Sequence, residues 1–92
     1  MALQIINAGP PPEEIADRIR AAIAQAMPEA TIEVRCQGPG HFEITVTDAV
    51  FEGLSRVKQQ QQVYGAITAL MAGPTPAIHA VDRLECLVPG VA

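Results

Sequence analysis

The sequence predicts an α+β domain in which two helices pack on one face of a three-stranded sheet, in the order αββαβ. Three observations support this prediction. An amphipathic stretch follows the prolines near the N-terminus, two alternating stretches flank a glycine-containing turn, and a second long helical stretch precedes a final apolar segment. This architecture buries the apolar stripe of each helix and one face of each strand. With 92 residues, the chain has room for one such core.

The first helix is predicted to run from Pro12 to about Met27. Proline suits the first turn of a helix, where its missing N–H costs nothing. Apolar residues then recur at spacings of three and four, which places them on one helix face; they are Ile15, Ile19, Ala22, Ile23 and Ala26. We expect residues 1–11 to form a flexible lead, residues 12–88 the domain and residues 89–92 a tail.

Two strands are predicted to form a β-hairpin. Apolar and polar residues alternate from Thr31 to Cys36 and again from Phe42 to Thr47, as in strands with one buried face. The segment Gln37–Gly40 separates them and contains two glycines. Glycine permits the backbone conformations of tight turns, so we expect the two strands to be direct neighbours.

The second long helix is predicted to begin after Ser55, because serine is a favoured N-cap. Gly53 permits a turn just before it. The helix should end near Gly73–Pro74, since proline cannot continue it. The segment Ile78–Val88 is then predicted to be the third strand.

Composition and charge bear on location and partners. The net charge is −4 and the pI is about 4.9, whereas nucleic-acid binders usually carry a basic field. No apolar run approaches the ~20 residues that cross a bilayer, and the N-terminus lacks the charged and apolar regions of a signal peptide. We therefore expect a cytoplasmic protein without membrane association, in which Cys36 and Cys86 are free thiols.

No pattern of residues indicates catalysis. Ser55 has no general base near it in the sequence, and Gly38-Pro39-Gly40 lacks the lysine and the strand-to-helix context of a phosphate-binding loop. The cysteines do not show the Cys-x-x-Cys spacing of metal sites. We expect that the protein is not an enzyme and that the isolated chain holds no cofactor.

Two motifs carry more specific information. One runs from Phe51 to Gly65 and reads FEGLSRVKQQQQVYG, and the other is Ile78-His79-Ala80-Val81. Together they resemble the BolA family, and most closely its IbaG-like branch. The resemblance covers residues 12–84. It implies an αββαβ architecture similar to a class II KH domain, in agreement with the order predicted above.

The sequence departs from the family pattern at two places. Members of BolA proper carry Arg-His-Arg where this chain has Gln59, Gln60 and Gln61. This difference removes two positive charges from a helix that has been proposed to touch DNA. The C-terminal part, Leu84–Pro89, also lacks the family's usual Thr-Pro-Glu-Glu-Trp segment, which begins a final helix.

The resemblance further implies a partner and a cofactor. BolA-like proteins pair with monothiol glutaredoxins in iron–sulfur trafficking or in iron and redox signalling. In these heterodimers a labile [2Fe–2S] cluster is shared between the glutaredoxin cysteine, glutathione and ligands from the BolA-like chain. The implied ligands here are His79 and one hairpin residue, either Cys36 or His41. Imidazole and thiolate are both established ligands of iron–sulfur clusters.

Each of these residues also has a purely structural interpretation. His79 would then hydrogen-bond a backbone carbonyl. Cys36 shares the alternation of the apolar residues of its strand, which predicts a buried and inert thiol. His41 has the opposite alternation and should point away from the buried face. Cys86 is expected to be a packing residue or an exposed free thiol.

A second interpretation is a KH-like transcriptional regulator that binds nucleic acid. It would use the turn at Gly53 and the positive charges of Arg56 and Lys58 at the start of the helix. The run Gln59–Gln62 cannot present all four side chains to one partner, because successive helix residues are about 100° apart. A third interpretation is a protein–protein adaptor or a homodimer that uses no metal.

Overall fold

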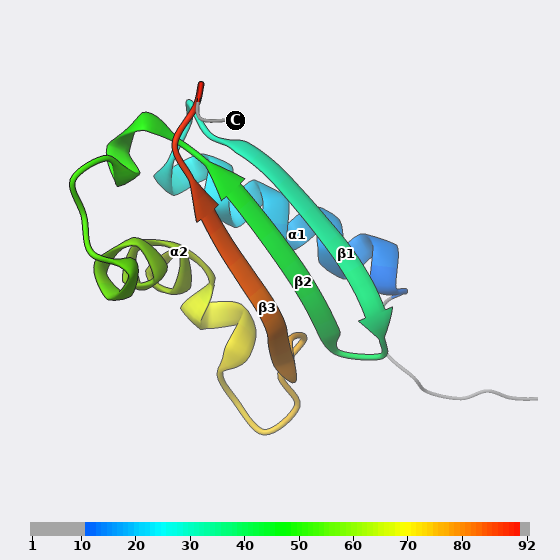
Figure 1. Cartoon of the computed structure of the whole chain (residues 1–92). Helices are drawn as coiled ribbons and strands as arrows, with labels where there is room; N and C mark the ends of the chain where they lie inside the picture. Colours follow the sequence, from blue (N-terminus) through cyan, green and yellow to red (C-terminus); the bar gives the residue numbers. More distant parts are fainter. Residues whose placement is uncertain (1–10, 91–92) are drawn as a thin grey trace, which may run out of the picture.

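The computed structural model describes residues 11–90. In chain order the elements are α1 (Pro12–Ala26), β1 (Thr31–Gly38), β2 (His41–Thr47), the 3-10 helix η1 (Ala49–Phe51), α2 (Arg56–Met71) and β3 (Ala80–Leu87). The predicted αββαβ order is confirmed, with η1 as a short addition (Figure 1). The predicted lead at 1–11 lies outside the described residues except for Pro11, and so do the last two residues of the predicted tail.

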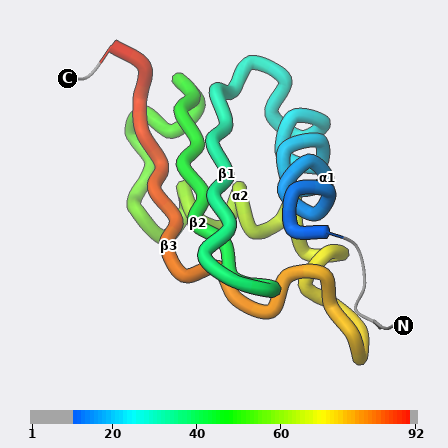
Figure 2. The backbone as a smooth tube through the Cα atoms, turned by 90° about the vertical axis from the view of Figure 1, so that its right-hand side faces the viewer, coloured from blue at the N-terminus to red at the C-terminus, as the bar shows by residue number. Residues whose placement is uncertain are grey.

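The three strands form one mixed sheet in the order β1-β2-β3. β1 and β2 pair antiparallel as the predicted hairpin, whereas β3 pairs parallel to β2. A parallel pair needs a long crossover, and here η1 and α2 provide it. Both helices lie on the same side of the sheet, as predicted, and no helix or strand of residues 11–90 covers its other face (Figures 1 and 2).

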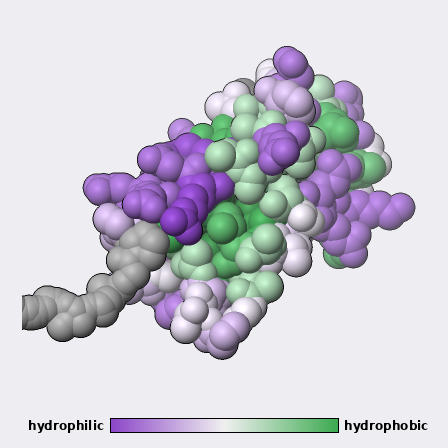
Figure 3. Space-filling model, turned by 180° about the vertical axis from the view of Figure 1, so that it is seen from behind, coloured by the Kyte–Doolittle hydropathy of each residue, from purple (hydrophilic) through white to green (hydrophobic). Residues whose placement is uncertain are grey.

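The core lies between the sheet and the two helices. In β2, buried residues alternate with half-buried ones, which confirms the predicted period of two. The largest fully buried side chains are Phe42, Phe51, Ile19, Ile23, Ile44, Ile67 and Ile78. Seen from the helix side, apolar surface lies in the middle of the molecule between polar regions (Figure 3). Within residues 11–90, no helix has the length and apolar character needed to span a membrane.

The helix starts follow the predicted local chemistry. Pro12 occupies the first turn of α1. Ser55 is the N-cap of α2, and its side-chain oxygen accepts the Lys58 N–H at 3.2 Å. Asp48 does the same for η1, since its carboxylate accepts the Val50 N–H at 2.9 Å. Side-chain oxygens satisfy N–H groups that have no partner within a helix.

The third strand begins later than predicted. Pairing with β2 starts at Ala80 and not at Ile78. Ile78 is 1% exposed and its N–H donates to the carbonyl of Leu70 at 3.0 Å, so this residue packs against the end of α2 before the strand begins. His79 therefore precedes β3 and is not part of it.

Candidate functional site

The turn between β1 and β2 lies beside the start of β3. The Gly40 carbonyl accepts two hydrogen bonds, from the N–H of His79 at 2.8 Å and from the N–H of Ala80 at 3.0 Å. The strand register places His41 opposite Ala80. The hairpin and the Ile78–Val81 motif, which are far apart in the sequence, therefore meet at one end of the sheet.

The imidazole of His79 packs directly on Gly40. A Cβ atom built on Gly40 would lie 2.6 Å from Cγ and 2.8 Å from Nδ1 of His79, closer than real Cβ atoms approach other heavy atoms. Gly40 also has a φ of +78°, in the left-handed region that favours glycine. Because Cγ and Nδ1 face Gly40, Nε2 is the ring nitrogen remote from this contact. His79 is exposed, and no backbone carbonyl within residues 11–90 accepts a hydrogen bond from its ring.

His41 has a carboxylate partner that the sequence did not suggest. Its Nδ1 lies 3.1 Å from Oδ1 of Asp82. The β2–β3 register shifts between Phe42 and Glu43, which leaves Asp82 as the extra residue of a bulge. A carboxylate on one ring nitrogen orients an imidazole and leaves the other nitrogen to act as a ligand. As predicted, His41 is exposed.

Cys36 lies within β1, opposite Phe42, and not in the turn. The sequence pattern predicted a buried thiol, and this interpretation is wrong because Cys36 is exposed. The physical reason is that β1 is an edge strand, in which Val34 is buried while the three residues after it are not. The Cys36 thiol donates to the carbonyl of Gly38 at 3.2 Å.

The three donors lie at the same end of the sheet but do not converge. Cys36 pairs with Phe42 and shares its face, whereas His41 is the neighbour of Phe42 in β2 and lies on the opposite face. No group of three or more His, Cys, Asp or Glu side chains within residues 11–90 is arranged to hold a metal ion. His79 lies on Gly40, His41 follows Gly40 in the chain, and Cys36 comes from the neighbouring strand. One thiol and two imidazoles are nevertheless donor types that iron–sulfur clusters accept.

The second cysteine lies in a different environment. Cys86 pairs with Val46 near the C-terminal end of the β2–β3 ladder and is half-buried. Burial raises the pKa of its thiol, because the charged thiolate loses solvation. This arrangement fits the packing role that was one of the two predictions for Cys86.

We expect iodoacetamide to alkylate Cys36 before Cys86. The thiolate is the reacting form, and the raised pKa of Cys86 reduces its thiolate fraction at neutral pH while burial restricts access. Mass spectrometry of peptides after brief labelling measures both rates. In the matched variant Cys36→Ala only the slow reaction should remain, and equal rates at the two cysteines would contradict the difference in exposure.

The turn before α2 is held by the first glutamine of the run. Gly53 has a φ of +82°, which confirms the predicted turn. The Gln59 side-chain amide donates to the carbonyls of Phe51 at 3.0 Å and Leu54 at 3.2 Å. Gln59 therefore stabilises the turn through these two hydrogen bonds, so its role is not limited to solvating the helix surface.

Arg56 and Lys58, the two cations of the nucleic-acid interpretation, lie at the start of α2 and are called the basic patch. Both Arg56 and Lys58 are exposed. Arg56, together with Gln59, Gln60 and residues 83–87, lines a shallow hollow of about 350 Å³ between α2 and β3, and Lys58 does not. The basic patch is separate from the histidines, because the structure places Arg56 beside the later part of β3.

Comparison with known proteins identifies the family. Residues 18–88 match the family of BolA-like proteins. The chain belongs to the BolA family. Acid stress protein IbaG of Escherichia coli K12 is 44% identical over 51 residues, which are 54% of this chain and 58% of that protein. BolA-like protein 1 of Mus musculus is 31% identical over 69 residues, 65% of this chain and 50% of the mouse protein. The match spans about half the length of these curated relatives.

Solved BolA structures have the same fold. BolA1 of Mus musculus superposes with a TM-score of 0.67 at 26% identity, over 94% of this chain and 72% of that chain. A BolA-like protein of Babesia bovis gives 0.64 at 24% identity, over 91% and 92%. The BolA domain of SufE1 from Arabidopsis thaliana gives 0.63 at 19% identity, over 88% and 96%. The predicted α+β architecture is therefore confirmed.

Proposed function

We propose that this BolA-family chain is a non-enzymatic adaptor that pairs with a monothiol glutaredoxin and helps to ligate a shared, labile [2Fe–2S] cluster. The observation that carries the proposal is the contact between His79 and Gly40. It places an exposed imidazole beside the hairpin that contains the other two candidate ligands, Cys36 and His41. The family resemblance in the two sequence motifs supports the choice of partner.

In this proposal His79 supplies its Nε2 to the cluster. Gly40 packs against the Cγ–Nδ1 side of the ring, so the imidazole is already positioned before the partner binds. A preorganised ligand loses less conformational entropy on binding. When bound, the [2Fe–2S] cluster would either be transferred to another protein or act as a signal of iron or redox status. Histidine ligation in place of cysteine raises the reduction potential of a cluster. The remaining ligands come from the glutaredoxin cysteine and from glutathione.

The second ligand of the chain is Cys36 or His41. For His41, the Asp82 carboxylate at 3.1 Å from Nδ1 would leave Nε2 as the donor. For Cys36, exposure makes the sulfur accessible to a partner. Asp82 orients His41 in the chain itself, whereas Cys36 would have to give up its hydrogen bond to the Gly38 carbonyl.

Reconstitution with a monothiol glutaredoxin, iron, sulfide and glutathione tests the proposal. We expect the heterodimer to show visible absorption and circular dichroism that differ from those of the glutaredoxin homodimer. His79→Ala should abolish this difference, because the cluster loses its ligand from the chain. Either Cys36→Ala or His41→Ala, but not both, should change the spectrum as well and so identify the second ligand.

The matched control is Cys86→Ala, which removes a thiol from the half-buried position in β3 and should leave the spectrum unchanged. The proposal is overturned if the wild-type chain gives no heterodimer spectrum. It is also overturned if His79→Ala, still folded by far-ultraviolet circular dichroism, gives the wild-type spectrum.

The nucleic-acid interpretation stays a prediction with weaker support. Its residues are in place, since Gly53 forms the turn and Arg56 and Lys58 are exposed. Two cations on a chain with a net charge of −4 would nevertheless release few counterions from a phosphate backbone. A cytoplasmic location likewise stays a prediction.

A further inference from the structure

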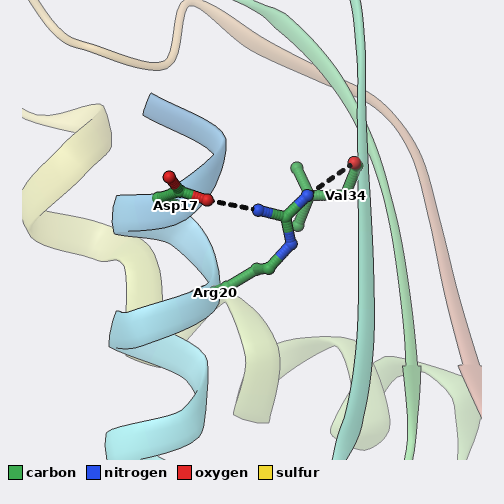
Figure 4. A network of polar contacts seen from close by, with 3 residues as sticks. All are labelled: Asp17, Arg20 and Val34. Carbon is green, nitrogen blue, oxygen red and sulfur yellow. Dashed lines mark hydrogen bonds and ion pairs between the residues drawn. The ribbon is translucent and has the colours of Figure 1, made fainter. Parts of the chain in front are cut away.

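The edge strands of the sheet are β1 and β3, and β1 is called the guarded edge because a side chain of α1 hydrogen-bonds its backbone. Edge strands present backbone groups that can pair with another chain. At β1, Arg20 reaches across from α1 and donates to the Val34 carbonyl at 3.4 Å, while Asp17 holds the same guanidinium at 2.6 Å (Figure 4). A strand that approached this edge would have to displace Arg20.

The other edge, β3, is open to an additional strand. Within residues 11–90, β3 has β2 as its one strand neighbour, and no side chain of this range donates to its backbone carbonyls as Arg20 does to Val34. The shallow hollow of about 350 Å³ beside residues 83–87 separates this part of β3 from the start of α2. Residues 83–87 also follow the bulge and keep a regular register with β2.

We propose that β3 pairs antiparallel with β3 of a second copy of this chain, with the twofold axis at Leu84. Residues opposite each other in a ladder share a face of the sheet. Centring the pair on Leu84 places Arg83 opposite Glu85 of the second copy, and Glu85 opposite Arg83 of the second copy. The same surface is used twice, as in other twofold dimers.

Charge selects this register over its neighbours. Centring the pair on Arg83 would place two arginines opposite each other, and centring it on Glu85 would place two glutamates there. Like charges directly opposite destabilise a strand pair, whereas opposite charges stabilise it. Within one chain Arg83 already contacts Glu85 at 3.1 Å, and these side chains are 64% and 44% exposed. In the dimer the two arginines and two glutamates form one alternating group.

Apolar contact at the centre adds to the charge pattern. Leu84 is half-buried and lines the hollow beside the open edge. Pairing brings Leu84 of the second copy against it and removes both from water. The product is a continuous six-stranded sheet, and the inference does not depend on the glutaredoxin proposal.

Charge exchange at positions 83 and 85 tests the dimer. Sedimentation equilibrium over a wide concentration range should show the mass of the wild type rising from 9.7 kDa toward twice that value. Arg83→Glu and Glu85→Arg should each weaken association by at least roughly tenfold, because each variant places like charges opposite each other. An equimolar mixture of the two variants should associate as the wild type does, since all facing charges are then opposite. The double exchange R83E/E85R should also restore the dimer.

The matched control is Arg35→Glu on the guarded edge, which should leave the association constant unchanged. A mass of 9.7 kDa at every concentration overturns the proposal. It is equally overturned if Arg83→Glu dimerises as strongly as the wild type, or if the equimolar mixture stays monomeric while both variants are folded.

Discussion

Replacing Gly40 by alanine should destabilise the domain by about 2–5 kcal/mol and move the His79 ring out of its position. The left-handed backbone at φ +78° costs a residue with a Cβ roughly 1–2 kcal/mol. The remainder comes from the new Cβ, which would lie 2.6 Å from Cγ of His79. A steric conflict of this kind costs about 1–3 kcal/mol. Urea unfolding measures the stability, and the histidine resonances in NMR spectra report the ring position.

Gly53→Ala is the matched control for this experiment. Gly53 has nearly the same φ, +82°, but a Cβ there would meet no heavy atom within 4 Å. It should therefore show the backbone cost alone and leave the His79 resonances unchanged. Equal losses of stability in the two variants, with His79 unmoved in both, would contradict the packing of His79 on Gly40. If the proposed function is correct, Gly40→Ala also perturbs the cluster spectrum whereas Gly53→Ala does not.

Phe42→Ala should cost about 3–5 kcal/mol of folding free energy, the usual range for a buried phenylalanine. Phe42 is 0% exposed and lies in the central strand, between Cys36 of β1 and Val81 of β3. The truncation removes the buried ring and leaves a cavity that neighbouring side chains only partly fill. Because domains of this kind are stable by only about 5–15 kcal/mol, the variant should lose a large part of its free energy of unfolding.

Chemical denaturation measures the free energy of unfolding of Phe42→Ala and of the control variant Val57→Ala, each relative to the wild type. Val57 is 61% exposed in the first turn of α2, so its truncation should change stability by less than about 0.5 kcal/mol. A loss below about 1 kcal/mol for Phe42→Ala would mean that this ring is not a central part of the core.

The elements that local chemistry controls were predicted correctly. The spacing of Ile15, Ile19 and Ile23 gave the buried face of α1, since helix periodicity alone decides which residues share a face. The alternation around Phe42 gave the buried face of β2 for the same reason. Ser55 gave the start of α2 because its cap bond lies within three residues of chain. Each of these features depends on neighbours in the sequence.

The features that were missed depend on contacts between distant segments. Asp82 meets His41 only because a bulge in β3 leaves it without a partner on β2, and no sequence spacing encodes that contact. The exposure of Cys36 follows from its place on an edge strand, and strand order cannot be read from alternation. The late start of β3 follows from the hydrogen bond between Ile78 and Leu70.

By itself, the sequence determined the helices, the hairpin, the apolar faces around Ile19 in α1 and Phe42 in β2, and the histidine-containing motif of a BolA-like chain. Periodicity, capping and turn preferences act over a few residues, so they can be read directly from the chain. Only the tertiary structure decided that His79 packs on Gly40 and that Arg20 guards β1 while β3 stays open. Those outcomes require segments far apart in the chain to meet, and the meeting point is set by packing of the whole domain.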